Sequence, residues 1–393
     1  MPRSTGQRLG AHFTKRHTRK AESSKMTAAV KTTRPKHDPY QIHADEREER
    51  YARGWYVIGA TNSVNLKPRA LNVFGTKLVA YRGKEDGEVH ILDAYCPHMG
   101  GDLCGGEVKG NSVVCPFHLW SWGADGVCDD IPYANKIPDK AVIKSWPVLE
   151  KNGLIFVWQD PEGNPPIAEQ EPARMEDWYS EAWTDWEMEA IPIESLGREL
   201  VDNMADMAHF GPIHYSSVKS FKNTMEGHQF VQYMVGGHEI LTEGEEGLIT
   251  SVARYEGPAY MTTTMTGLMD GHPMKVHLLV SHIPTDMNQF TINFGVMMQK
   301  DPKASKAQNN AMVQEYMEKN IESFHQDVAV WNNKCIIDNP LLCDGDGPIN
   351  LVRKWYSQFM TDVDEIQPNQ VKAREHVTLD GPSVEEVREK QGF

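Results

Sequence analysis

The chain has 393 residues, of which 40% are hydrophobic and 24% charged, so it is long enough for two domains with their own cores. Its formal net charge of −15 argues against nucleic acid as the main partner, and no stretch approaches the roughly 18 apolar residues of a membrane span. Six cysteines are too few for a disulfide-stapled secreted scaffold, so we expect a reducing, cytoplasmic setting.

The first 36 residues differ in charge from the rest. They contain ten Lys/Arg and a single acidic residue, Glu22, which leaves −24 for the remainder. Without an apolar core this stretch is not a secretory signal peptide. Its Arg, Ser and Thr content would also suit an organellar transit peptide. We favour a disordered extension over residues 1–44, within which Met26 offers an alternative start.

Short β-rich runs follow from Tyr51 to Trp158, separated by Gly and Asn/Asp turns. This spacing predicts a small antiparallel sandwich or barrel. The Pro-rich and acidic stretch from Gly163 to Glu176 is typical of a linker, which places the first domain at about residues 45–165. The predicted strands are Gly54–Gly59, Ala70–Gly75, Lys77–Tyr81, Val89–Asp93, Ala141–Trp146 and Leu154–Trp158.

Two short loops in this domain each carry one cysteine and one histidine, as Cys96-Pro-His98 and Cys115-Pro-Phe-His118. Thiolate and imidazole at such spacing bind soft or borderline metals, which leaves structural zinc and a [2Fe–2S] cluster as alternatives. Structural zinc sites are usually richer in cysteine. One Cys and one His per loop suits two irons, one bound by both thiolates and the other by both imidazoles. We therefore favour the iron–sulfur cluster.

Such a Rieske cluster does not decide the function by itself, because respiratory carriers, small ferredoxins and oxygenases all contain one. In the respiratory pattern an additional cysteine in each loop forms a disulfide that braces the cluster. Gly101 and Phe117 occupy those positions here, which argues against that class. Cys104 and Cys128 lie elsewhere and are expected to be small buried hydrophobic side chains rather than ligands.

The second domain, over residues 166–393, is predicted to be α+β. Apolar residues at helical spacing predict a helix from Glu199 to Ile213, and alternating patterns predict strands between residues 228 and 300, including Lys275–Ser281 and Gln289–Val296. The longest helix is expected from Ala307 to Lys334. Its apolar stripe consists of Met317, Ile321, Phe324, Val328 and Trp331.

A second metal site is suggested by Asp206, His209 and His214. On an ideal helix His209 and His214 would lie about 140° apart, so they converge only if the helix ends between them. The Gly211-Pro212 pair is expected to supply that break. From these histidines alone, a metal site and ordinary core or surface positions remain alternatives.

Asp327 favours the metal, because it lies on the apolar stripe of the long helix. A buried carboxylate is costly without a partner, which can be a metal, an arginine or a capped amide. His209, His214 and Asp327 together would form a 2-His-1-carboxylate triad that holds Fe(II) and leaves positions for O₂ and substrate. The remaining acidic and histidine side chains of this helix are expected in solvent, namely Glu315, Glu318, Glu322 and His325.

Over about residues 51–365 the sequence resembles the large subunit of Rieske non-haem iron oxygenases, and within them the oxygenase component of bacterial 3-ketosteroid 9α-hydroxylase. The cluster and triad motifs carry the resemblance to the superfamily, and further stretches point to the steroid branch. These stretches are Tyr51–Trp55, Phe74–Val79, Tyr95–Leu103, Ile131–Ala134, Gly153–Trp158, Gly163–Pro166, Asp202–His209 and Ile337–Leu342.

The resemblance implies an all-β Rieske [2Fe–2S] domain followed by a helix-grip (START-like) antiparallel-sheet catalytic domain. It assigns Asp206 as the carboxylate that carries electrons from the cluster of a neighbouring subunit to the iron, within a homotrimer. The implied cluster ligands are Cys96, His98, Cys115 and His118, and the implied iron ligands are His209, His214 and Asp327.

The implied reaction is O₂-dependent hydroxylation of a 3-ketosteroid at C9α. Because no G-x-G-x-x-G fingerprint follows a strand here, NADH is expected to act through a separate reductase. The segment Tyr260–Met269 and Trp331 are candidates for lining the substrate pocket, with core packing as the alternative. Two other functions remain open: hydroxylation or dealkylation of another apolar or aromatic compound, and an electron carrier whose second domain only binds a partner.

Overall fold

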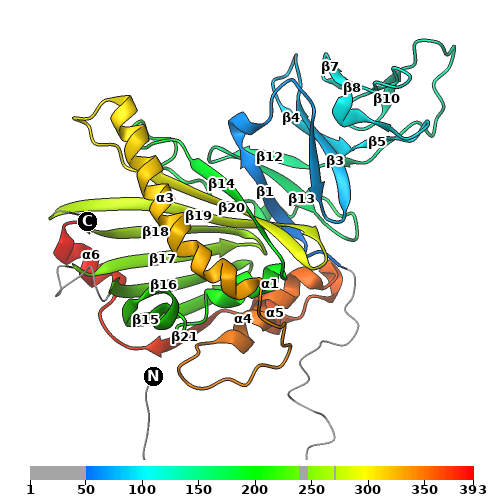
Figure 1. Ribbon diagram of the computed structural model, residues 1–393. Coiled ribbons are helices and arrows are strands. Elements are labelled where there is room, and N and C mark those ends of the chain that lie inside the picture. The colour runs from blue at the N-terminus through cyan, green and yellow to red at the C-terminus, as the bar shows by residue number, and fades with distance from the viewer. Residues whose placement is uncertain (1–49, 239–246, 270) are drawn as a thin grey trace, which may run out of the picture. The chain divides into compact units, whose positions relative to one another are not determined.

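The computed structural model describes residues 50–238, 247–269 and 271–393, and these described residues belong to one compact unit. The expectation for residues 1–44 lies outside the described residues. Within residues 54–159 the chain forms short strands, whereas the later residues build one large sheet crossed by a long helix (Figure 1). The boundary between the two domains at about residue 165 remains a prediction.

The first domain consists of short antiparallel sheets, as the alternating pattern predicts. Two hydrophobic cores fill it, one around Leu78 and one around Trp122. In sheet order its strands are β1 (Gly54–Ala60), β13 (Leu154–Gln159) and β12 (Val148–Lys151); β11 (Ser145–Trp146), β4 (Val89–Asp93), β3 (Thr76–Arg82) and β2 (Arg69–Val73); β10 (Cys128–Asp130), β9 (Ser121–Trp122), β8 (Ser112–Val114) and β7 (Glu107–Lys109); and β5 (Tyr95–Cys96) with β6 (Gly101–Asp102).

One predicted strand, Ala141–Trp146, is mostly irregular, and only its last two residues form β11. The side chains of Ala141 and Ile143 are buried, which explains the alternating pattern. Their backbone groups, however, bond to the start of β10 and the turn before it, since Cys128 N–H donates to the Ala141 carbonyl and Ile143 N–H to that of Gly126. The alternating pattern of apolar residues therefore predicted the buried side chains correctly, but it did not predict that regular strand hydrogen bonding would be missing.

The second domain is built on an eight-stranded antiparallel sheet, which confirms the predicted α+β architecture. The strands predicted at Lys275–Ser281 and Gln289–Val296 lie within two neighbouring strands near one edge of this sheet. In sheet order the strands are β14 (Glu187–Ile193), β20 (Gln289–Met298), β19 (His272–Asp286), β18 (Tyr260–Met269), β17 (Ile249–Glu256), β16 (Gln229–His238), β15 (Ser216–Glu226) and β21 (Arg374–Leu379).

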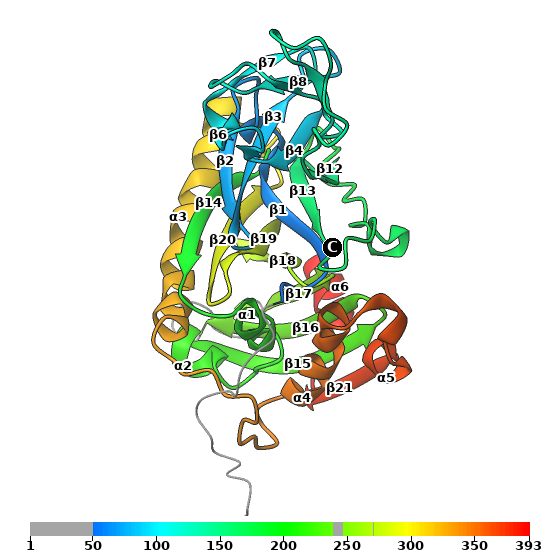
Figure 2. The same ribbon diagram turned by 90° about the vertical axis from the view of Figure 1, so that its right-hand side faces the viewer.

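The long helix α3 (Lys306–Trp331) crosses one face of this sheet, and the C-terminal helix α6 (Val384–Gln391) packs on the other (Figures 1 and 2). The predicted apolar stripe of α3 faces the core, with Met317 and Trp331 buried. The helix starts at a capping box made by Ser305 and Gln308. The short helices α4 (Ile349–Tyr356) and α5 (Pro368–Val371) pack against each other.

The helix predicted from Glu199 to Ile213 is in fact two helices, α1 (Gly197–Asn203) and α2 (Phe210–His214). The Asp206 carboxylate accepts a hydrogen bond from the Ala208 N–H at 2.9 Å, and this local turn competes with the helical ladder. The break thus precedes His209 instead of following it. Gly211 and Pro212 lie in the first turn of α2, where the missing N–H of a proline costs nothing.

Strand β1 of the first domain is joined to the second domain by buried hydrogen bonds. The Arg53 side chain is fully buried and donates to the carbonyls of Gln358 and Thr361 at 2.9 and 2.8 Å. Asn293 of β20 donates to the Val57 carbonyl at 2.8 Å. Burial lowers the pKa of Arg53, although nearby acidic side chains oppose this effect.

Candidate metal centres and substrate cavity

The two cysteine–histidine loops are held by tight backbone turns. Gly100 N–H donates to the Cys96 carbonyl at 2.8 Å, and Cys115 N–H donates to the Trp120 carbonyl at 2.8 Å. Both cysteine side chains are buried, each about 1% exposed, and both histidines are half-buried. The two thiols therefore lie on the buried side of the loops, and the two imidazoles lie closer to the protein surface.

The two loops face each other. The rings of His98 and His118 have centroids 4.6 Å apart, and Trp120 stacks on His98 at 4.6 Å. A Cβ on Gly101 would lie 2.6 Å from the Cys115 sulfur, so only glycine permits this approach. The sequence prediction that these four ligands come together is consistent with this geometry.

Two features of this pocket fit a cluster. His98 Nδ1 is buried and has no hydrogen-bond partner among the described residues, which is costly for a ring nitrogen that binds nothing. Burial raises the pKa of the Cys96 thiol, and the neighbouring Cys115 contributes in the same direction. Thiols in this environment stay protonated unless a metal displaces the proton. Cys104 and Cys128, as predicted, pack in the adjacent hydrophobic core.

The second candidate centre is formed by His209, His214 and Asp327. One potential ligand atom from each lies within 4.8 Å of the others, and this is the only such group of three found among the described residues. His214 Nε2 is 3.1 Å from Asp327 Oδ2, and the two imidazole centroids are 5.3 Å apart. His209 caps the start of α2 and His214 ends it, while Asp327 comes from α3.

Each of the three side chains has atoms free for a metal. His209 Nδ1 lies 2.7 Å from the Asp206 carbonyl oxygen, which can only accept, so Nδ1 carries the proton and Nε2 is available. His214 Nδ1 is buried without a hydrogen-bond partner among the described residues. Asp327 is 6% exposed, as expected from its place on the apolar stripe. The set fits a small divalent cation, and a 2-His-1-carboxylate site is typical of Fe(II).

Asp206 lies in the turn between α1 and α2, not on a helix face. Its carboxylate Oδ2 is 3.6 Å from His209 Nδ1, and its side chain is 36% exposed. Burial would raise the pKa of Asp206, but the hydrogen bond and charge of His209 lower it below the ordinary value. An ionised carboxylate is therefore in contact with one ligand of the triad and also reaches the surface.

A cavity of about 240 Å³ opens from the triad toward the sheet. From the predicted segment Tyr260–Met269, only alternate residues line it, and Trp331 does not, because it packs in the core. Residues that the sequence did not single out complete the wall. Most of them are apolar, including Met204, Met234, Leu278, Val280 and Phe294, and Gln232 and Asn320 are polar.

The other side chains of α3 follow the prediction. Glu315, Glu318, Glu322 and His325 are exposed, so Asp327 is the acidic side chain that this helix buries. Among the described residues no helix is both long and apolar enough to cross a membrane.

Comparisons with known proteins match both domains of the chain. Residues 54–147 match the Rieske [2Fe-2S] domain, and residues 157–360 match the 3-Ketosteroid 9alpha-hydroxylase C-terminal domain. The solved structures of apo dicamba monooxygenase and of Pseudomonas putida CBB5 NdmB share the fold, with TM-scores of 0.59 and 0.63. Their identities are 16% and 15%, over 78% and 82% of this chain and 96% of each structure.

Sequence relatives are closer. An oxygenase component of 3-ketosteroid-9-alpha-monooxygenase from Rhodococcus rhodochrous is 41% identical over 89% of this chain and 93% of its own length. One from Mycobacterium tuberculosis is 39% identical over 84% and 88%. Cholesterol 7-desaturase of Xenopus laevis is 31% identical over 79% and 72%. The chain therefore belongs to the Rieske oxygenases, in the family of the 3-ketosteroid 9α-monooxygenase oxygenase components.

Proposed function

We propose that this protein is the terminal oxygenase of a two-component monooxygenase that hydroxylates a 3-ketosteroid at C9α, with electrons from NADH supplied by a separate reductase. The relatives that share about 40% of its sequence are named as oxygenase components of 3-ketosteroid-9-alpha-monooxygenase. The balanced reaction consumes O₂, two electrons and two protons, inserts one oxygen atom into a C–H bond and releases water.

The observation that carries this proposal is the convergence of His209, His214 and Asp327 at a mainly apolar cavity. We assign these three side chains to Fe(II). Bound there, the iron supplies the activation of O₂. We assign Cys96, His98, Cys115 and His118 to the [2Fe–2S] cluster that feeds it with electrons.

The chain itself orients the substrate and excludes water. The cavity is somewhat smaller than the roughly 300–1,000 Å³ typical of ligand pockets, so a fused-ring substrate has to displace side chains. Met204, Met234, Met261 and Met265 in its wall can do this, because methionine changes rotamer at little cost. His209 Nδ1–H donates a hydrogen bond to the Asp206 carbonyl oxygen, which fixes the ring orientation.

We further propose that the active form is a homotrimer in which Asp206 bridges His209 to a cluster histidine of a neighbouring subunit and so provides the path for electron transfer to the iron. Asp206 is partly exposed beside His209, so it can contact a second chain. Exposed apolar side chains surround the half-buried cluster histidines and would suit a docking surface. They are Tyr95, Met99, Phe117 and Leu119. Light scattering on the purified protein would give three times the mass of 44.4 kDa.

All six cysteines are free, which supports a reducing compartment, and we propose that the enzyme works in the bacterial cytoplasm. A second candidate reaction is desaturation, because a cholesterol 7-desaturase is among the relatives. Hydroxylation or dealkylation of another apolar compound by the same centre is a further alternative.

The test is to incubate the enzyme with a reductase, NADH and a panel of 3-ketosteroids, followed by mass spectrometry. Hydroxylation adds one oxygen atom, which becomes heavy when ¹⁸O₂ is used, whereas desaturation removes two hydrogens. Iron analysis separates both from an electron carrier, since an oxygenase holds three irons per chain and a carrier only the two of its cluster. A chain with two irons and no product from any steroid would contradict the proposal.

A further inference from the structure

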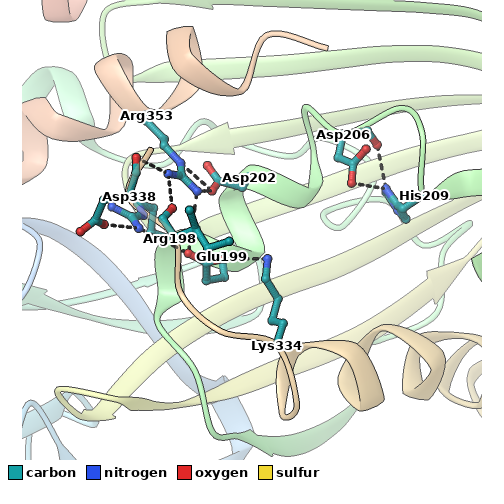
Figure 3. A network of polar contacts seen from close by, with 9 residues as sticks. Arg198, Glu199, Asp202, Asp206, His209, Lys334, Asp338 and Arg353 are labelled. Carbon is teal, nitrogen blue, oxygen red and sulfur yellow. Dashed lines mark hydrogen bonds and ion pairs between the residues drawn. The ribbon is translucent and has the colours of Figure 1, made fainter. Parts of the chain in front are cut away.

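A buried carboxylate lies in the first turn of α1, outside both candidate metal centres. The Glu199 side chain is 1% exposed, and Lys334 Nζ lies 2.7 Å from its Oε2 (Figure 3). Its Oε1 faces the guanidinium groups of Arg198 and Arg353 at 3.4 and 4.0 Å. The negative charge of Glu199 is thus balanced by cations from three segments of the chain.

Arg353 of α4 fixes the other end of α1. Its Nε and Nη2 donate to Asp202 Oδ2 at 2.8 and 2.6 Å. Its Nη1 donates to the carbonyls of Ile337 and Asp338, in the loop between α3 and α4, at 2.7 and 2.9 Å. Polar contacts therefore hold α1 at its first turn and again at its last turn.

These contacts join the two segments that supply the triad. Helix α1 leads directly into the turn that carries Asp206 and His209, as Figure 3 shows. Lys334 follows the end of α3, the helix that carries Asp327. The ion pair between Glu199 and Lys334 is therefore a short connection between the histidine-bearing turn and the carboxylate-bearing helix.

Energetics favour a positional role over a stabilising one. Taking Glu199 out of water is costly, and packed apolar side chains of similar volume would often stabilise the fold as well or better. Leu200 and Val201, its neighbours on α1, already bury apolar surface in the core. An ion pair differs from such packing because it is directional, and its energy falls when the atoms move out of hydrogen-bond geometry.

We propose that the Glu199–Lys334 ion pair positions the turn of Asp206 and His209 against α3, and thereby sets the affinity of the triad for its metal. Glu199 acts through the turn that follows α1 and is a positioning residue. This inference rests on the metal site proposed above. It adds a specific contact, more than a hundred residues apart in sequence, on which that site depends.

The test compares the full-length wild-type chain with Lys334→Met, Lys334→Arg and Lys319→Met. Each protein is stripped of mononuclear iron with a chelator and titrated with Fe(II) under exclusion of O₂, while the visible spectrum follows the cluster. Lys334→Met should bind Fe(II) about 10-fold more weakly, as expected for the loss of a supporting contact, with an unchanged cluster spectrum. Lys334→Arg should restore most of the affinity, because the cation remains.

Lys319→Met is the matched control. Lys319 is a residue of α3, but its ion pair with Glu315 is exposed to solvent. Its affinity should equal that of the wild type. The double variant Glu199→Gln with Lys334→Met separates positioning from stability. Because Glu199→Gln removes the buried charge that has lost its closest cation, the double variant should regain thermal stability, yet its Fe(II) affinity should stay low.

Wild-type affinity in Lys334→Met, or in the double variant, would overturn the proposal. So would an equal loss of affinity in Lys319→Met. If the wild-type chain takes up no Fe(II) at the triad, the proposed function fails together with this inference. If it does take up Fe(II), and Lys334→Met does so equally well, only the ion pair loses its role.

Discussion

Replacing Asp327 by alanine should have opposite effects on the iron-free and iron-loaded protein. In the iron-free chain Asp327 is a carboxylate with 6% exposure, and the His214 imidazole lies 3.1 Å from it. Removing a poorly compensated buried charge relieves a desolvation cost, which in proteins amounts to several kcal/mol per ion. We therefore expect iron-free Asp327→Ala to be at least as stable as the iron-free wild type.

With iron the order should reverse. A ligand that binds only the folded state stabilises it by RT ln(1 + [L]/Kd), which is about 2.7 kcal/mol at a hundredfold excess over Kd. At about 2–4 °C per kcal/mol, this predicts a rise of roughly 5–10 °C in the wild-type melting temperature. Asp327→Ala has lost one of three ligands, so its melting temperature should rise far less.

The assay is thermal unfolding with and without Fe(II), combined with iron analysis and turnover. Asp327→Ala should lose one iron per chain and all hydroxylation while its cluster keeps the visible spectrum. His325→Ala is the matched control, because His325 is an exposed residue of the same helix, and its response to Fe(II) should match the wild type. An equal rise in both variants, or product formation by Asp327→Ala, would refute the assignment of the triad.

Three further predictions concern other groups. Asp206→Ala should keep all three irons but stop multiple turnover, because the carboxylate beside His209 is gone; normal rates per NADH would argue against a bridging role. Cys96→Ser should lose the visible absorption of the cluster, whereas Cys104→Ser should keep it, since burial raises the pKa of the Cys104 thiol to about 12 and it packs in the core. The pKa of Asp177 lies below its ordinary 3.8 because contacts with Lys275 and His277, at 2.6 and 2.7 Å, outweigh burial. Its stabilising effect is therefore present at neutral pH and lost as pH falls from 3.8 through the lowered value, so the difference in melting temperature between Asp177→Asn and wild type should shrink only in that acidic range.

The cysteine–histidine loops could be predicted from the sequence because the two proposed ligands of each loop are close together in the chain. At most two residues separate Cys96 from His98 and Cys115 from His118. Each pair therefore lies on one turn, independently of the fold of the rest of the chain. Asp327 was readable for a different reason, since a carboxylate on an apolar stripe needs a compensating partner. Both signals depend on residue type and spacing, which the sequence contains in full.

The predicted position of the helix break near His209 and His214 was wrong, although the two histidines do come together in the structure. The prediction gave Gly211-Pro212 the role of helix breaker, because these residues are unfavourable inside a helix. Proline is tolerated in a first turn, and the hydrogen bond of Asp206 to Ala208 starts a new helix just before it. A side chain that bonds its own backbone decided the helix boundary, and helix propensity alone does not report such bonds.

The cavity could be predicted only in part, from the segment Tyr260–Met269, because the rest of its wall is assembled from strands distant in sequence. Met234 is on β16, Met265 on β18 and Phe294 on β20, and only the pairing register of the sheet brings them to one face. The same holds for Glu199, Lys334 and Arg353, whose contacts span more than a hundred residues. Pattern reasoning identifies which residues are buried but not which distant residues they meet.

The composition of the cavity wall links substrate tolerance to orientation. Its methionines can adopt new rotamers, so the volume available to a ligand can change without backbone movement. At least one of its polar groups is fixed, because the Gln232 amide donates to the Met204 carbonyl at 2.8 Å and is buried. Movable apolar walls would accommodate different ring substituents, whereas fixed polar groups would limit the orientations of a ligand before His209, His214 and Asp327. Such a site would accept several related steroids yet oxidise each at the same position, which is why a substrate panel has to report the position of the new oxygen as well as its presence.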